Sequence, residues 1–378
     1  MVVLTATTLM SLNMFLPALP ILAIDLGTDY ATASWAISGY LAATGLVQLV
    51  AGPISDNVGR RPVVLTALAV FALASIGCAL SQTITQFLLF RFGQSVAVAG
   101  YAMSLAIVLD TTETDAATSK LGTISASVAI VPMLSPFLGG LLTEFLGWRS
   151  CFWLYALCGL GLLAITYVDL GETRKPGNAS PAEDRSRLLR NPRFWGFAAC
   201  MGFSVGAFYI FLAGAPLVAT QVFGINSAIL GGILGSITAG FLVGSIASAR
   251  LGQRLGPMPL ILTGRTVALI GLTTGMVLFL FGATSPYLYF AATWCVGIGN
   301  GLTTPGANAS ALSVEPKAAG AAAGICGATV VFCGAGLTAI AGSTVGGDRP
   351  ELILLALMLL SSIVGFCALL LTRQPRQF

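Results

Sequence analysis

One arginine interrupts a long apolar stretch of this chain. Arg91 lies several residues inside the run 85–109, and helical spacing places it on one stripe with Gln94 and Tyr101. A charge inside a membrane span costs several kcal/mol unless the side chain faces water or a partner. This mixed polar and aromatic stripe therefore predicts the wall of a buried cavity. The alternative is an arginine that extends along its helix to the membrane surface.

A second polar patch is predicted in the first apolar run. Because Pro17 has no amide hydrogen, the carbonyl of Asn13 loses its helical partner, and Pro20 does the same to Leu16. Free carbonyls at membrane depth must face protein or water. Together with the Asn13 side chain they form a neutral polar patch at mid-depth. The alternative is a helix kink that has no role in binding.

The run 121–145 has the features of a bendable helix. Pro132 and Pro136 each remove a helical hydrogen bond, and Gly139 and Gly140 let a neighbouring helix approach closely. Kinked packing is the simpler interpretation, and it is compatible with a functional one.

A polar loop, GPISDNVGRRP at 52–62, separates two apolar runs. Its glycines permit backbone angles that other residues disfavour, and its aspartate can cap a helix or pair with a cation. Its arginines favour the cytoplasmic side. A similar loop without the aspartate lies at 248–257, after the apolar run 227–249 of the second half. On these residues alone the first loop is a capped turn or an ordinary positively charged loop, and its residues of interest are Gly52, Asp56, Gly59, Arg60 and Arg61.

Aromatic and neutral polar side chains elsewhere in the apolar runs are candidates for a substrate cavity. A roomy apolar cavity with scattered polar groups suits an amphipathic small molecule. Each aromatic residue alone can equally belong to helix packing. The candidates are Phe15, Tyr40, Phe208, Tyr209, Trp294 and Asn300.

The composition excludes a soluble fold and most kinds of catalytic site. Of the 378 residues, 56% are hydrophobic and 8% are charged, whereas soluble domains carry about 25% charged residues. The chain has no histidine, and its 8 cysteines lie in or at the ends of apolar runs without disulfide-like spacing. It contains no phosphate loop and no nucleophile elbow. We therefore expect no enzyme activity, no cofactor, no metal site and no nucleic-acid partner.

The apolar runs predict an all-α integral membrane protein with twelve transmembrane helices in two pseudo-symmetric six-helix bundles. The polar segment 170–193 divides the runs into six and six, and its composition is typical of a linker with one short helix. The predicted divisions are a bundle at 1–169, a cytoplasmic linker at 170–194 and a bundle at 195–378. The runs lie near 3–24, 34–51, 63–81, 85–109, 121–145, 151–169, 195–220, 227–249, 258–282, 286–306, 318–343 and 350–372.

The basic residues predict the orientation of the chain. Of the 18 lysines and arginines, all but Arg91, Arg149 and Arg349 fall on one side if the N-terminus is cytoplasmic. Arg265 is counted with that majority. Because basic residues favour the cytoplasmic side, we expect both termini to lie in the cytoplasm.

The loop at 52–62 resembles the signature loop between helices 2 and 3 of the major facilitator superfamily. The matching places are Gly52, Asp56, Gly59, Arg60 and Arg61. The resemblance extends over nearly the whole chain. It implies a secondary transporter in which this loop helps to latch the two halves on the cytoplasmic side.

Further stretches resemble the bicyclomycin and chloramphenicol or florfenicol resistance branch of the twelve-helix drug:proton antiporters. The resemblance assigns Arg91 to proton coupling, and Pro136, Gly139 and Gly140 to an antiporter-type helix. One departure concerns Asn13, because this branch usually carries an aspartate there. The stretches are SLNMFLPALP at 11–20, RFGQSVAVAG at 91–100, VPMLSPFLGGLL at 131–142, GWRS at 147–150 and GETR at 171–174.

This branch resemblance implies a monomeric exporter in the bacterial inner membrane, working by alternating access with proton antiport. Its expected substrates resemble amphenicols, bicyclomycin or other amphipathic compounds. A metabolite or sugar exporter and an uncoupled facilitator of the same fold are the alternatives. None of the 14 acidic residues is at mid-span, and asparagine does not titrate. Either a boundary carboxylate such as Asp25 or Asp110 carries the proton, with Arg91 modulating it, or coupling is weak.

Overall fold

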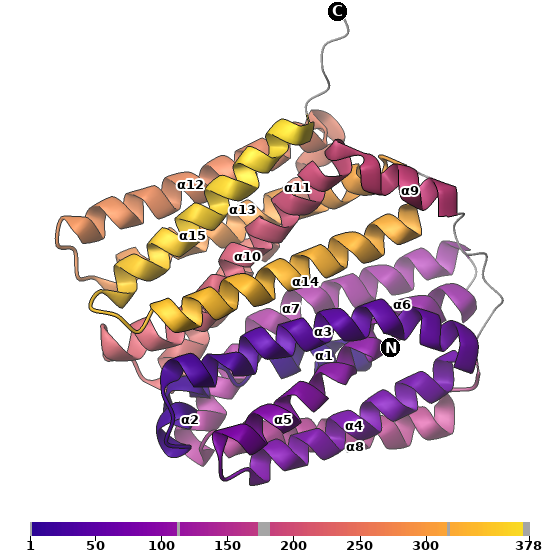
Figure 1. The fold of residues 1–378 in the computed structure, drawn as a ribbon, viewed down its shortest axis with the longest axis horizontal. Coiled ribbons are helices and arrows are strands. Elements are labelled where there is room, and N and C mark those ends of the chain that lie inside the picture. Colours follow the sequence, from indigo (N-terminus) through magenta and orange to yellow (C-terminus); the bar gives the residue numbers. More distant parts are fainter. Residues whose placement is uncertain (1, 112–113, 173–181, 316–317, 373–378) are drawn as a thin grey trace, which may run out of the picture. The chain divides into compact units, whose positions relative to one another are not determined.

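The computed structural model describes residues 2–111, 114–172, 182–315 and 318–372, and every regular element in these ranges is a helix (Figure 1). A number of helical residues in these ranges have undescribed side chains. The apolar runs form helices because a helix satisfies its own backbone hydrogen bonds where no water is present.

The helices of the first half follow the order of the predicted runs. The first run is divided into α1, a 3-10 turn and α2, and a second 3-10 turn divides the fourth run. The elements are α1 (Val2–Asn13), η1 (Leu16–Ala18), α2 (Leu19–Asp25), α3 (Tyr30–Val58), α4 (Arg60–Leu80), α5 (Ile84–Gln94), η2 (Ser95–Ala97), α6 (Val98–Thr111), α7 (Thr114–Leu146) and α8 (Arg149–Asp169).

The linker contains the expected short helix, α9 (Ala182–Arg190). The second half consists of long helices and ends in a 3-10 segment. These elements are α10 (Pro192–Gln221), α11 (Ser227–Leu255), α12 (Pro257–Leu280), α13 (Pro286–Leu312), α14 (Ala319–Thr344), α15 (Pro350–Cys367) and η4 (Ala368–Thr372).

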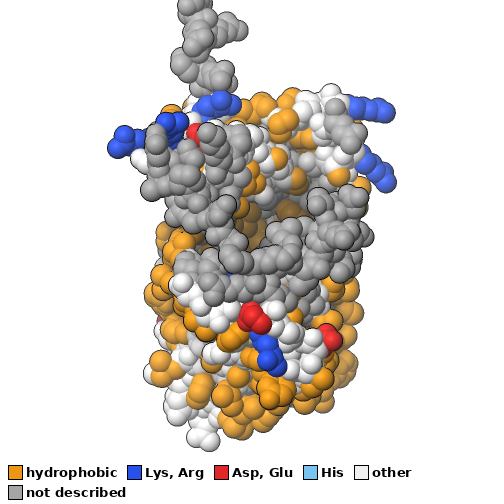
Figure 2. All heavy atoms as spheres, turned by 90° about the vertical axis from the view of Figure 1, so that its right-hand side faces the viewer, with side chains coloured by type: hydrophobic (Ala, Val, Ile, Leu, Met, Phe, Trp, Pro, Cys, Tyr) orange, Lys and Arg blue, Asp and Glu red, His pale blue; other side chains and the backbone are white. Residues whose placement is uncertain are grey.

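Helices occupy each of the twelve predicted runs. Within the described residues, nine helices are long and apolar enough to cross a membrane, so the twelve-span count remains a prediction for the other runs. Large apolar side chains such as Ile24, Phe145 and Val168 are exposed. Figure 2 shows hydrophobic side chains along the flanks of one face, with charged side chains in few places. An exposed apolar surface of this extent indicates contact with lipid.

The chain forms two compact units. One contains residues 1–177 together with 219–235, and the other contains 178–218 together with 236–378. Residues 219–235 join the first unit because the start of α11 packs closely on α7. The predicted division at the linker 170–194 remains a prediction.

Local sequence signals explain several helix ends. The Asp29 side chain caps α3 by accepting from the amide of Thr32 at 3.3 Å, and this bond lowers the pKa of the Asp29 carboxyl. Gly59 separates α3 from α4 with a φ of 107°, and Gly256 separates α11 from α12 with a φ of 76°. Because glycine adopts positive φ without strain, each pair of long helices can reverse at one residue. The two loops that echo each other in the sequence therefore share this turn.

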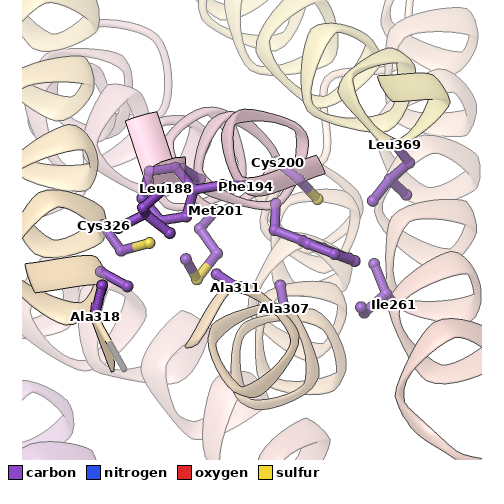
Figure 3. Close-up of a cluster of buried hydrophobic side chains, with 13 residues drawn as sticks. Leu188, Phe194, Cys200, Met201, Ile261, Ala307, Ala311, Ala318, Cys326 and Leu369 are labelled. Atoms are coloured by element: carbon purple, nitrogen blue, oxygen red, sulfur yellow. The ribbon is translucent and has the colours of Figure 1, made fainter. Parts of the chain in front are cut away.

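A buried apolar cluster attaches the linker helix α9 to the other helices of the second unit (Figure 3). Leu188 of α9 is fully buried against Phe194 and Met201 of α10, beside Cys326 of α14. Small residues of α13, Ala307 and Ala311, complete this contact. The linker helix is therefore anchored to the second unit by a leucine on its apolar face.

Candidate functional site

Arg91 lies where the first, second and fourth runs meet, and its side chain is fully buried. Its Nε donates to the carbonyl of Ala36 at 3.2 Å, and its Nη2 donates to the carbonyl of Ser11 at 2.8 Å. Nη1 donates to Gln94 Oε1 at 2.7 Å and to Ser11 Oγ at 3.3 Å. Each guanidinium nitrogen therefore has an acceptor, and every one of these acceptors is uncharged.

Two aromatic rings enclose the same guanidinium. The Arg91 Cζ atom lies 4.2 Å from the centroid of the Phe15 ring and 4.1 Å from that of Tyr40. Each such cation–π contact is worth about 0.5–2 kcal/mol. The Tyr40 hydroxyl also donates to Ser11 Oγ at 3.4 Å. The structure thus brings the predicted residues Arg91, Gln94, Phe15 and Tyr40 together, and Arg91 does not extend to the membrane surface.

Gln94 connects this group to the third run. Its Nε2 donates to Ser75 Oγ at 2.7 Å, and Ser75 Oγ donates to the carbonyl of Phe71 at 2.6 Å. Among the described residues, no carboxylate lies within ion-pair distance of Arg91. The charged side chains that are buried in this part of the chain are those of Arg91 and Arg265. A buried cation held by neutral groups acts strongly on any titratable group that approaches it, because the local dielectric is low.

The break in the first run lies against the proline- and glycine-containing helix. α1 ends at Asn13, where the structure has the interruption that Pro17 and Pro20 predict. The Asn13 side chain is buried, and its Nδ2 donates to the carbonyl of Leu9 at 2.8 Å. At Gly139 of α7, a methyl group would overlap the backbone oxygen of Met14. Only glycine therefore permits this approach of α7 to the break.

The next glycine makes a similar contact with α11. A side chain at Gly140 would overlap the carbonyl of Ser227, and one at Gly231 would overlap the carbonyl of Pro136. Gly235 has the same relation to the carbonyl of Met133. The predicted close packing around Pro132, Pro136, Gly139 and Gly140 is therefore present, with α1 at one glycine and α11 at the other.

Glu172 holds the candidate gate loop from the linker side. Its two carboxylate oxygens accept from the backbone amides of Arg60 at 2.9 Å and Arg61 at 3.3 Å. These amides begin α4, where a negative charge is favourable. Arg61 Nη2 donates to the carbonyl of Tyr167 at 2.9 Å, and a side chain at Gly59 would collide with Glu172. In the sequence, Glu172 stands out only as part of the stretch GETR, and nothing near it there indicates a contact with Arg60.

Some predicted residues fall outside the described side chains. Gly52 and Asp56 belong to α3, and Tyr101 and Asp110 belong to α6. Their side chains are not among the described ones, so their proposed roles remain predictions.

A second buried arginine corrects the sequence-based placement of Arg265. It was counted among the cytoplasmic basic residues, but it lies within α12 and its side chain is fully buried. Its Nε donates to Thr303 Oγ1 at 3.0 Å, and its Nη2 donates to Asn300 Oδ1 at 2.6 Å. Asn300 Nδ2 donates to the carbonyl of Ser204 at 2.9 Å. The sequence itself indicated a buried position, since Arg265 falls inside the predicted run 258–282.

Other cavity candidates are dispersed in the second unit. The Phe208 and Tyr209 rings lie with centroids 5.8 Å apart on α10, and Tyr209 packs on Gly334 of α14. Trp294 is 38% exposed and contacts Gly240 of α11. The structure therefore does not gather these three with Asn300, which belongs to the Arg265 group.

The boundary carboxylate Asp25 has partners at the end of the first run. Trp148 Nε1 donates to it at 2.9 Å, and Arg149 forms an ion pair with it. Both members of the ion pair are partly exposed. Asp25 is therefore tied to the start of α8 rather than to Arg91.

Comparisons with known proteins identify the family of this chain. The sequence pattern of the Major Facilitator Superfamily matches residues 1–339. The chain is 32% identical over 232 residues to multidrug resistance protein MdtL of Escherichia coli and to MdtL of Shigella dysenteriae, covering 61% of this chain and 59% of each relative. The chain thus matches less than two thirds of the length of these relatives.

Solved transporter structures share the fold. A D-xylose-proton symporter superposes with a TM-score of 0.76 at 13% identity, covering 97% of this chain and 96% of that chain. A bacterial homologue of the human lysosomal transporter Spinster, inward-facing and unoccupied, gives 0.71 at 14% identity, covering 98% of this chain and 94% of that chain. At these identities the likeness concerns the fold alone. The family match over most of the chain shows that this multi-pass membrane protein belongs to the Major Facilitator Superfamily.

Proposed function

We propose that this chain is a secondary transporter that exports amphipathic small molecules across the bacterial inner membrane by alternating access. The observation that carries the proposal is the broken first run, which packs on Gly139 beside the enclosed Arg91. Discontinuous helices and close glycine contacts suit elements that rearrange around a binding site. The similarity to multidrug resistance protein MdtL favours drugs as substrates, and bicyclomycin and the amphenicols are the first to test.

The loop at 52–62 is proposed as the cytoplasmic gate of a monomer whose termini are both cytoplasmic. The carboxylate of Glu172 on the amides of Arg60 and Arg61 supports this role, because it fixes the start of α4 through a contact that can be broken. Asp56→Asn and Arg60→Ala are expected to keep the protein in the membrane and slow transport.

Proton antiport is the proposed mode of coupling. Of the two boundary carboxylates, Asp110 is the one that Arg91 would modulate, because Asp25 is paired with Arg149. Asn13 is not the proton carrier because an amide does not titrate. We expect Asn13→Asp to place a titratable group in the cavity and make transport more dependent on pH. An unchanged pH profile in that variant would argue against this arrangement.

An uncoupled facilitator is the second candidate function, and one observation favours it. Among the described residues no aspartate or glutamate is buried, so the carrier that antiport requires has no representative at mid-depth there. In that case substrate moves only down its own gradient.

The test of export is drug susceptibility in cells that lack their own exporters. Expression of the wild-type chain is expected to raise the inhibitory concentration of at least one compound of the bicyclomycin or amphenicol type. Arg91→Ala, expressed to the same level in the membrane, is expected to abolish this protection, and Arg91→Lys to keep part of it. Equal protection by wild type and Arg91→Ala would contradict the role of Arg91. Unchanged susceptibility with the wild type would contradict drug export.

A further inference from the structure

Arg265 carries a buried charge that its own chain leaves incompletely paired. The side chain is fully buried in the second unit, with Nε on Thr303 and Nη2 on Asn300. Its Nη1 is buried and has no hydrogen-bond partner among the described residues. A guanidinium offers five N–H donors, and a buried donor without an acceptor is unfavourable because it has lost its hydrogen bonds to water.

The neighbouring groups cannot neutralise this charge. Thr303 and Asn300 contribute neutral oxygens, and Asn300 is held in place by its bond to the carbonyl of Ser204. The acidic residues of the second unit whose surroundings are described are Glu315, Asp348 and Glu351, and none of them is buried. Within the described part of that unit, the balancing negative charge is therefore missing.

The local packing fixes the arginine where it is. Gly264 and Gly299 meet at the contact of α12 with α13, where a side chain on either would overlap the carbonyl of the other. This close approach places the guanidinium against the polar side chains of α13. The Arg265 side chain stays buried there instead of extending to the membrane surface.

We propose that Arg265 binds the carboxylate of an amphipathic organic acid that this transporter carries. Nη1 supplies two free donors, and a carboxylate accepts two parallel N–H bonds in the geometry that arginine favours. Asn300 and Thr303 position the guanidinium. This inference rests on the proposed function and adds a substrate class to it, since a site with a buried positive charge favours anions over lipophilic cations.

The test measures binding, so that it is independent of transport. The full chain is purified and placed in bilayer discs of phosphatidylcholine, and its thermal unfolding is followed while sodium chloride is exchanged for sodium benzoate at constant ionic strength. Benzamide is the neutral control. A ligand that binds only the folded state raises the melting temperature with concentration. We expect benzoate to do so and benzamide to have no effect.

Three variants connect this shift to the site. Arg265→Gln is expected to weaken benzoate binding by about tenfold or more, because a hydrogen bond to a charged group is lost. Asn300→Asp places a carboxylate on Nη2 and is expected to give a folded protein that no longer responds to benzoate. Arg250→Gln, which removes an exposed charge from α11, is the matched control and is expected to behave as wild type.

The outcomes separate the proposals. No shift when benzoate replaces chloride would overturn the carboxylate assignment, as would an equal shift with benzamide or an undiminished shift in Asn300→Asp. If Arg265→Gln does not fold, Asn300→Asp decides the question alone. Benzoate binding that depends on Arg265, in a protein that protects cells from no drug, would contradict drug export and leave this site intact. Drug export without any benzoate response would contradict the carboxylate site and leave the proposed drug export intact.

Discussion

Two buried arginines define two regions of this protein, and they differ in how their charges are satisfied. All three nitrogens of Arg91 have acceptors, and two aromatic rings cover its guanidinium. Arg265 has two neutral acceptors and leaves Nη1 without one among the described residues. Each region also includes a hydrogen bond to the backbone of the first helix of its half. Arg91 donates to the carbonyl of Ser11, and Asn300, which holds Arg265, donates to the carbonyl of Ser204.

The difference teaches that burial alone does not identify a binding residue. Arg91 is occupied by the chain itself, so its charge serves to tie the first, second and fourth runs together and to act on neighbouring groups. Arg265 has N–H donors on Nη1 without an acceptor among the described residues, and these are the donors that we assign to a ligand. The following changes test this comparison.

The largest effect is expected for Arg91→Met. The substitution removes the cation and strands the Ser11 carbonyl and the Gln94 amide oxygen, which are buried. Each buried acceptor left without a donor costs about 1–3 kcal/mol. Thermal unfolding in detergent should therefore show a large fall in melting temperature. A stability equal to that of the wild type would show that the cluster is not structural.

A smaller loss is expected for Gly139→Ala, because its methyl group meets the backbone oxygen of Met14 beside the Arg91 cluster. Overpacking of this kind costs about 1–3 kcal/mol, and the efflux rate should fall with stability. Gly161→Ala is the matched control, since that glycine of α8 faces open space. There alanine should stabilise the helix by about 0.5–1 kcal/mol. Equal effects at both positions would remove the steric explanation.

Glu172→Gln should have a modest effect, because the carboxylate caps the start of α4 at an exposed site. Loss of a charge at a helix N-terminus costs about 0.3–1 kcal/mol. Transport should slow more than stability falls if the contact belongs to the gate. Glu144→Gln, at an exposed position of α7, serves as the control. Identical transport rates in both variants would place Glu172 outside the gate.

The smallest effect on stability is expected for Arg265→Met without ligand. Arg265→Met removes an incompletely paired buried charge, and the relief of its desolvation offsets the loss of its bonds to Thr303 and Asn300. The melting temperature should therefore stay close to that of the wild type or rise. A loss as large as that in Arg91→Met would show that the two arginines have the same role.

Several features could be predicted from the sequence because they depend on local chemistry. Pro17 and Pro20 predicted the break in the first run, and Gly139 and Gly140 predicted a close helix contact. Gly59 predicted an unusual turn, which its φ of 107° confirms. Each signal arises from one or two residues whose backbone properties are known in advance.

The rest depends on contacts between distant segments. Arg265 was counted with the basic residues of the cytoplasmic side, and its partners Asn300 and Thr303 are on another helix. Glu172 reaches Arg60 across 112 residues of sequence. A single sequence does not indicate which of many polar residues meet across such distances.

Uphill transport in membrane vesicles tests the central claim most directly. Inside-out vesicles that contain the wild-type chain are given a radiolabelled amphenicol and an acidic interior, with and without an uncoupler. The account predicts accumulation above the external concentration, lost with the uncoupler and absent in Arg91→Ala. Accumulation no greater than in vesicles without the protein would contradict export, and equilibration that ignores the uncoupler would contradict antiport in favour of the facilitator.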